Sequence, residues 1–174
     1  LRADPKTFDP MLTADESSFL VSYLTHGRLM RLNRQTQRAE ADLAESWKVQ
    51  DGGRKILITL REGAAFSDGK PLTTEDVVYT FTRLNDKTLR SPIAEQLRTS
   101  KGPVTAVASG PNRILLTLPA PIAGVERMFD SIPVMPSPAA AKRDGVVAGP
   151  FVMAEHKPGA FVLLKRNPHY WKKD

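Results

Sequence analysis

The sequence contains no cysteine. A chain without cysteine forms no disulfide, offers no thiolate nucleophile and builds no cysteine-based zinc site. Cysteine-free chains occur in every compartment, so this absence alone does not place the protein. It is compatible with a bacterial periplasm, where a stray thiol is exposed to oxidation.

Long apolar runs are absent as well. No stretch approaches the ~20 consecutive apolar residues of a membrane-spanning helix, and we identify no leader peptide in the chain. Hydrophobic residues still make up 41% of the 174 residues. That proportion is ordinary for a soluble globular protein and is enough for a packed core.

Catalytic motifs are also missing. The three histidines (His26, His156 and His169) are far apart in sequence, and no metalloprotease, phosphate-loop, dinucleotide-binding or nucleophile-elbow motif is present. Glu75 and Asp76 are adjacent, but they fall in the first turn of a predicted helix, where carboxylates favour the positive helix end. We interpret them as helix-cap residues, and we expect no enzyme, no cofactor and no metal.

The chain has a formal net charge of +6. Excess positive charge is one signature of nucleic-acid binding, but here the basic residues are scattered. The densest group lies near the chain end, in Lys165, Arg166, Lys172 and Lys173. We interpret it as a solvated surface and expect no nucleic-acid partner.

Two helices have clear signals. Residues 15–26 begin at a capping Asp15 and end before Gly27, with Phe19, Leu20, Tyr23 and Leu24 as the predicted apolar face. Residues 73–84 begin with Thr73 and carry Asp76 three positions later, which resembles a capping box. Shorter helices are predicted at 41–47, 93–98, 122–129 and in the alanine-rich stretch after Pro138.

Strands are predicted at 28–32 and 54–60, on both sides of a turn at 110–112, and in a hairpin over residues 149–167. In the second strand Ile56, Ile58 and Leu60 share one face. Strands and helices do not alternate regularly, which favours a mixed α/β (α+β-like) class over a doubly wound parallel sheet.

Three segments together resemble a known family. They are "PKTFDPMLTADESSFLVSYLTHGRLMRLN", "DLAESWKVQDGGRKILITLREGAAFSDGKPLTTEDVVYTFTRL" and "AGPFVMAEHKPGAFVLLKRNPHYW". In this order they resemble the bacterial extracellular solute-binding proteins of the peptide/nickel ABC-importer family. The family usually has a Thr-Gly pair before the proline that is Pro150 here, whereas this chain has Ala148-Gly149, and the stretch between Pro136 and Gly149 is short.

The resemblance implies the first lobe of a two-lobe periplasmic binding protein, with a mixed sheet and an inserted α/β subdomain. Residues 1–36 and 148–174 are expected to form the base of this lobe, and residues 37–147 an inserted scaffold. Family members are much longer, so we interpret the chain as an N-terminal part from which the second lobe is absent.

The resemblance also suggests ligand-facing residues. The segment after the extended arm of residues 3–12 supplies the first candidates, which are Thr13, Ala14, Asp15, Glu16, Ser17 and Ser18. Glu16 is placed to meet a ligand amine, although helix capping explains Asp15, Glu16 and Ser17 equally well. Arg90 and Met135 are further candidates, the first for an anionic group and the second as an adaptable apolar wall. Surface and core roles are the alternatives for these two.

The function implied is the substrate-binding component of an ABC importer, which captures peptides in the periplasm or as a lipid-anchored extracellular protein. Its partners are then a peptide or other small solute and a membrane permease, and we expect a monomer. Nickel complexes, oligosaccharides and opines are other solutes of such receptors. The alternative is a ligand-sensing domain of a bacterial transcriptional regulator with the same fold.

Overall fold

A computed structural model describes residues 1–174 except 2, 98–100, 123, 139–144 and 174. The helices are η1 (Pro10–Leu12), α1 (Glu16–Thr25), η2 (Asp51–Gly53), α2 (Thr74–Leu84), α3 (Pro92–Leu97) and η3 (Val125–Ser131), where η marks a 3-10 helix. The strands are β1 (Met30–Leu32), β2 (Ala39–Ala41), β3 (Ala44–Gln50), β4 (Lys55–Leu60), β5 (Thr105–Ala108), β6 (Arg113–Thr117), β7 (Phe151–Lys157) and β8 (Phe161–Arg166). Among these described residues no helix has the length and apolar character needed to cross a membrane.

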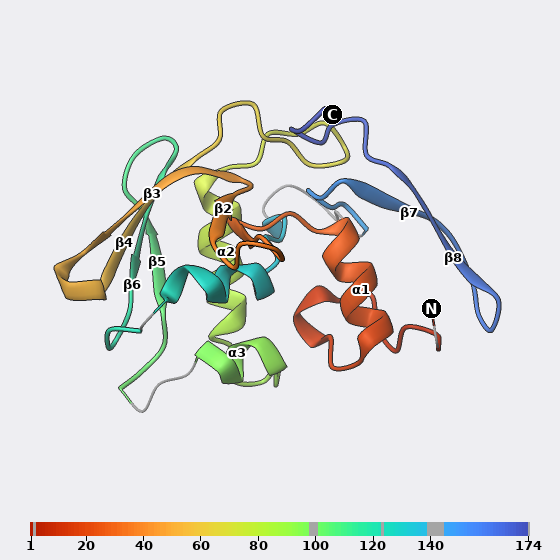
Figure 1. Cartoon of the computed structure of the whole chain (residues 1–174), viewed down its shortest axis with the longest axis horizontal. Coiled ribbons are helices and arrows are strands. Elements are labelled where there is room, and N and C mark those ends of the chain that lie inside the picture. The colour runs from red at the N-terminus through yellow and green to blue at the C-terminus, as the bar shows by residue number, and fades with distance from the viewer. Residues whose placement is uncertain (2, 98–100, 123, 139–144, 174) are drawn as a thin grey trace.

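The strands form three antiparallel units. A four-stranded sheet has the order β3-β4-β6-β5, and β1-β2 and β7-β8 are two-stranded. The four-stranded sheet lies at one end of the molecule and the β7-β8 hairpin extends from the other (Figure 1). The mixed α/β class is therefore confirmed. The expected sheet with both parallel and antiparallel strands is not found, because every strand pairing in the described part of the chain is antiparallel.

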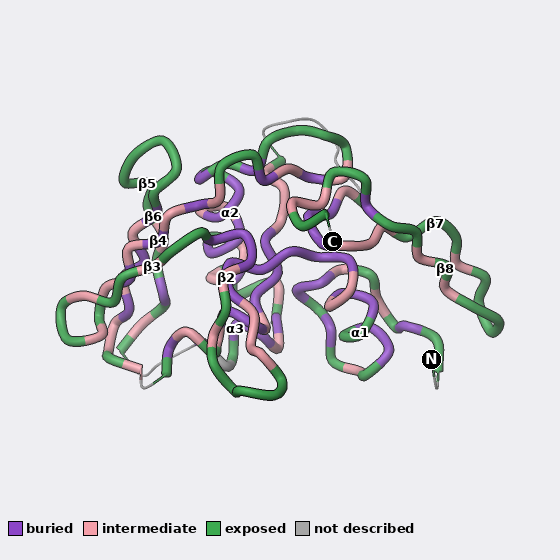
Figure 2. The backbone as a smooth tube through the Cα atoms, turned by 45° about the horizontal axis from the view of Figure 1, so that its top comes forward, coloured by how far each residue is buried: buried purple, intermediate pink, exposed green. Residues whose placement is uncertain are grey.

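The core lies between the four-stranded sheet and α2. Ile56 pairs with Leu116 and Ile58 with Ile114, and all four side chains are fully buried. The predicted stripe of α2 is confirmed, since Val77, Phe81 and Leu84 are buried within the same cluster. Figure 2 shows this buried centre, in contrast to the largely exposed hairpin.

The start of α2 is also as predicted. Thr73 is the N-cap, and its backbone N–H donates to Asp76 Oδ2 over 2.8 Å. The other oxygen of Asp76 accepts from the Ser137 amide over 2.7 Å. The Asp76 side chain is thus buried, and its carboxylate accepts hydrogen bonds from two backbone amides. This confirms the interpretation of Asp76 as a cap residue.

The helix predicted at 41–47 is wrong. Ala44 to Gln50 form strand β3, which pairs with β4 along its length. Alanine, leucine and glutamate favour helices in isolation, but the ladder to β4 supplies the backbone hydrogen bonds here, so tertiary pairing overrides local propensity.

The apolar face predicted for α1 is also wrong. Phe19 and Leu20 are 41% and 43% exposed. The buried side of the helix is mainly polar, in Ser17, Ser18, Val21, Ser22 and Thr25. Hydrogen bonds to the N-terminal arm compensate this burial: Ser17 Oγ donates to Ala3 O over 2.6 Å, and Ser18 Oγ accepts from the Thr7 amide over 3.1 Å.

The remaining predicted elements differ only in detail. α3 and the hairpin are confirmed within a few residues, and the helix expected at 122–129 is the 3-10 helix η3. The alanine-rich helix expected after Pro138 lies mostly outside the described residues.

Candidate functional site

The predicted ligand loop, residues 13–18, divides into inward and outward side chains. Thr13 is buried, with Oγ1 donating to Pro10 O over 3.3 Å. Asp15 is the N-cap of α1 and accepts from both the amide and the hydroxyl of Ser18, at 2.9 and 2.7 Å. These bonds lower the pKa of Asp15. Of these six residues only Ala14 and Glu16 are exposed.

Arg90 lies beside the residue that contacts η1, the turn before this loop. It is exposed and has a φ of 48°, and it precedes Ser91, whose hydroxyl donates to Met11 O over 2.6 Å. The structure therefore links the start of α3 to η1, the turn that precedes the predicted loop.

Met135 lines a groove that Asp9 and Pro10 also line. The groove has a volume of about 620 Å³ and is lined in part by Phe8, Tyr79, Arg83 and Met153. Met135 is half-buried, and Arg83 Nη1 donates to its sulfur over 3.5 Å. A role for Met135 as an apolar wall toward a solute stays a prediction, and Ala14 and Glu16 do not line the groove.

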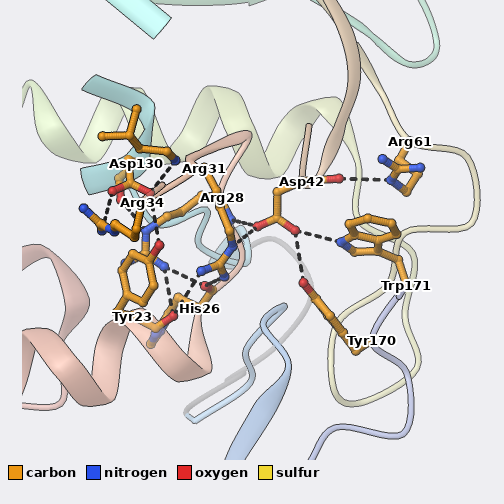
Figure 3. Close-up of polar contacts among 11 residues, drawn as sticks. Tyr23, His26, Arg28, Arg31, Arg34, Asp42, Arg61, Asp130, Tyr170 and Trp171 are labelled. Carbon is orange, nitrogen blue, oxygen red and sulfur yellow. Dashed lines mark hydrogen bonds and ion pairs between the residues drawn. The ribbon is translucent and has the colours of Figure 1, made fainter. Parts of the chain in front are cut away.

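A second polar cluster, which the sequence did not reveal, surrounds the end of α1 (Figure 3). Arg28 is 1% exposed. Its Nε donates to Asp130 O over 2.5 Å, and its Nη1 donates to the carbonyls of Tyr23 and His26. Arg31 reaches the same two carbonyls. Two guanidinium groups thus satisfy the free carbonyls at the negative end of the helix.

Burial controls the charge states in this cluster. It lowers the pKa of Arg28 to about 10, with the positive charge of Arg31 contributing, so Arg28 remains protonated at neutral pH. Burial also lowers the pKa of His26 to about 3, again with a neighbouring positive charge, that of Arg28. His26 is therefore neutral and structural in the folded chain.

His26 predicts an acid-sensitive stability. An unfolded histidine titrates near pH 6.5, so below that pH the unfolded chain binds a proton that folded His26 excludes. This contribution is fully present above pH 6.5 and is lost as pH falls toward 3. We expect about 2 kcal/mol less stability at pH 5 than at pH 7, measured by urea unfolding. His26→Gln should have a clearly smaller difference, and equal differences in both proteins would contradict this assignment.

Asp42 connects the cluster to the chain end. It is 1% exposed, and its Oδ2 accepts from Arg31 Nε at 2.7 Å and from the Arg28 amide at 3.1 Å. Its Oδ1 accepts from Trp171 Nε1 at 2.7 Å and from the Tyr170 hydroxyl at 3.3 Å. Burial and the negative charge of Asp42 raise the pKa of Tyr170 to about 12.

The two parts of the sequence linked by Asp42 are the "DLAESW" and "NPHYW" segments. Arg61 adds to the link, since its guanidinium carbon lies 3.8 Å from the centre of the Trp171 ring. Trp171 packs against the core. Trp171 therefore lies at the edge of the core.

Two glycines are required where β7 approaches the end of α1. A Cβ on Gly149 would lie 2.5 Å from the carbonyl carbon of Thr25. A Cβ on Gly27 would lie 2.7 Å from the Leu43 side chain and 2.8 Å from Ala148 O. Gly27 was expected to end α1, but the helix ends at Thr25 with His26 as its C-cap. Gly27 is needed for close packing.

Comparison with known proteins agrees with this architecture. Residues 38–174 match the family described as bacterial extracellular solute-binding proteins, family 5 Middle. A probable D,D-dipeptide-binding periplasmic protein of Escherichia coli, DdpA, is 29% identical, with 97% of this chain and 35% of that protein covered.

Solved structures share the fold. The oligopeptide-binding protein AppA of Bacillus subtilis, in complex with a nonapeptide, superposes with a TM-score of 0.83 at 23% identity, over 97% of this chain and 35% of that one. The binding protein MoaA from A.tumefacien R10, in complex with mannopinic acid, has a TM-score of 0.81 at 26% identity, over 97% and 36%. The chain spans about a third of the length of these relatives. The family match covers most of the chain, which therefore belongs to family 5 of the bacterial extracellular solute-binding proteins.

Proposed function

We propose that this chain forms part of the first lobe of a solute receptor that serves an ABC importer outside the cytoplasmic membrane. The observation that carries the proposal is the family match over residues 38–174. The receptor captures a small solute between this lobe and a second one, and delivers it to a membrane permease. Its activity is binding, without catalysis.

A peptide is the favoured solute. The relatives named above include a probable dipeptide-binding protein and a complex with a nonapeptide. On this chain the exposed residues Ala14 and Glu16 supply backbone groups and a carboxylate suited to a peptide backbone and its ammonium terminus. Arg90 supplies the complementary cation. The same relatives give the transcriptional-regulator alternative no support.

The domain boundaries remain part of the proposal. Residues 1–36 and 148–174 form the base of the lobe and residues 37–147 the inserted scaffold. The groove beside Met135 is lined from both parts, because Val21 and Met153 belong to the base and Tyr79 to the scaffold. We propose a monomer in a periplasmic or lipid-anchored extracellular location.

Calorimetry tests the proposed function. The intact gene product that contains this chain should bind at least one of the peptides Ala-Phe, Lys-Ala and Ala-Ala-Ala with micromolar or tighter affinity. The 174-residue chain alone should show no sub-micromolar binding, because a single lobe encloses only one side of a solute. Failure of the intact product to bind any small solute would refute the proposal, and tight binding by the chain alone would refute the two-lobe arrangement.

A further inference from the structure

Arg83, in the last turn of α2, forms an ion pair with the turn that precedes the ligand loop. This turn, η1, is capped by Asp9, whose Oδ1 accepts from the Met11 amide at 3.0 Å. The second carboxylate oxygen of Asp9 pairs with the Arg83 guanidinium. The two side chains are only 22% and 26% exposed, so water screens this ion pair less than it screens a surface pair.

Ser91 holds the same turn from α3. Its hydroxyl donates to Met11 O over 2.6 Å and accepts from the Ala94 amide over 3.3 Å. Ser91 is 1% exposed and Met11 is fully buried. One hydroxyl therefore caps α3 and also fixes η1, in a site where a lost hydrogen bond is not replaced by water.

These two contacts fix the chain immediately before the ligand loop. Thr13 is buried and bonded back to Pro10 O, and Ala14 reaches the surface at the next position. Arg83 also donates to the sulfur of Met135, and Ser91 directly follows Arg90. Arg83 thus joins η1 to Met135, and Ser91 joins η1 to the residue that follows Arg90.

We propose that Arg83 and Ser91 are positioning residues for solute binding. They do not need to contact the solute, because they hold η1 so that the Ala14 backbone and Glu16 are presented in one fixed conformation. Preorganising a loop in this way raises affinity by removing the entropy cost of ordering it on binding. This inference rests on the proposed function, since it gives a role in solute affinity to residues of the scaffold.

Hydrogen exchange of the 174-residue chain tests the positioning without any solute. We expect the Met11 and Leu12 amides to exchange at least about fivefold faster in Arg83→Gln and in Ser91→Ala, because each variant removes one attachment of η1. Arg83→Lys should be intermediate, since an ammonium group can still pair with Asp9. The matched control is Arg113→Gln at an exposed position on β6, which should leave both amides unchanged.

Calorimetry of the intact gene product with Ala-Phe adds the functional readout. We expect the dissociation constant to rise about tenfold in Arg83→Gln and in Ser91→Ala, with recovery in Arg83→Lys and a melting temperature that does not track the loss. Unchanged exchange at Met11 and Leu12 would overturn the inference, and so would faster exchange with unaltered affinity. If the wild-type protein binds no peptide, the peptide assignment fails, while the exchange result still decides whether these residues hold the turn.

Discussion

Gly149→Ala is expected to lower the free energy of unfolding by about 3 kcal/mol or more. The added Cβ would lie 2.5 Å from the carbonyl carbon and oxygen of Thr25 and 2.8 Å from the His26 nitrogen. All three are backbone atoms at the end of α1. The Gly149 amide donates to Thr25 O over 2.8 Å, so the segment at Gly149 and the end of α1 cannot move apart without losing this hydrogen bond. Urea unfolding measures the effect.

Gly63→Ala is the control for Gly149→Ala. Gly63 has a φ of 74° and no atom within 4 Å of an added Cβ, so it reports only the cost of the left-handed conformation, about 1 to 2 kcal/mol. A loss at Gly149 no larger than that at Gly63 would show that the close approach of β7 to α1 is not as tight as described.

Asp42→Asn is expected to cost about 3 to 5 kcal/mol. The carboxylate receives four donors, from Arg28, Arg31, Tyr170 and Trp171. An amide has only one acceptor oxygen and directs its N–H groups toward some of these donors. Arg31, whose side chain is 20% exposed, then remains charged without a negatively charged partner. Urea unfolding gives the cost.

A local signal should accompany the loss at Asp42. The one remaining oxygen should face the charged Arg31, so Trp171 loses the acceptor of its indole N–H. In a Trp47→Phe background its fluorescence should therefore move to longer wavelength before global unfolding. Asp51→Asn is the matched control, because Asp51 pairs with Lys55 at 3.7 Å on the surface and should change stability by at most about 0.5 kcal/mol. Equal losses for both variants would contradict the role given to Asp42.

The elements that the sequence predicted well have strong local signals. The capping pair Thr73 and Asp76 and the stripe of α2 define that helix completely, and the Pro158-Gly159 turn defines the β7-β8 hairpin. In each case residues within a few positions of one another decide the structure. Local chemistry is then sufficient.

Other features depend on distant partners. The exposed Phe19 and the buried Ser17 and Ser18 reverse the expectation from hydropathy, because the N-terminal arm offers hydrogen bonds to the serines. Strand β3 exists because β4 lies beside it. Neither arrangement can be inferred from the segment itself.

The candidate site shows the same division. Family resemblance located the segment 13–18, Arg90 and Met135, but it could not tell that only Ala14 and Glu16 of that segment are exposed. Asp42 and Trp171 are separated by 129 positions, and Asp9 and Arg83 by 74. No periodicity links residues at such separations, so these contacts required the structure.

The most direct test of the central claim is to repeat the Ala-Phe titration of the intact gene product while recording its backbone amide resonances. If this chain is a solute-binding lobe, the amides of Ala14, Glu16 and Arg90 should shift in proportion to the calorimetric saturation, and those of Gly110 and Asn112 in the distant β5-β6 turn should not. Saturable binding that leaves the amides of Ala14, Glu16 and Arg90 unchanged would contradict the account.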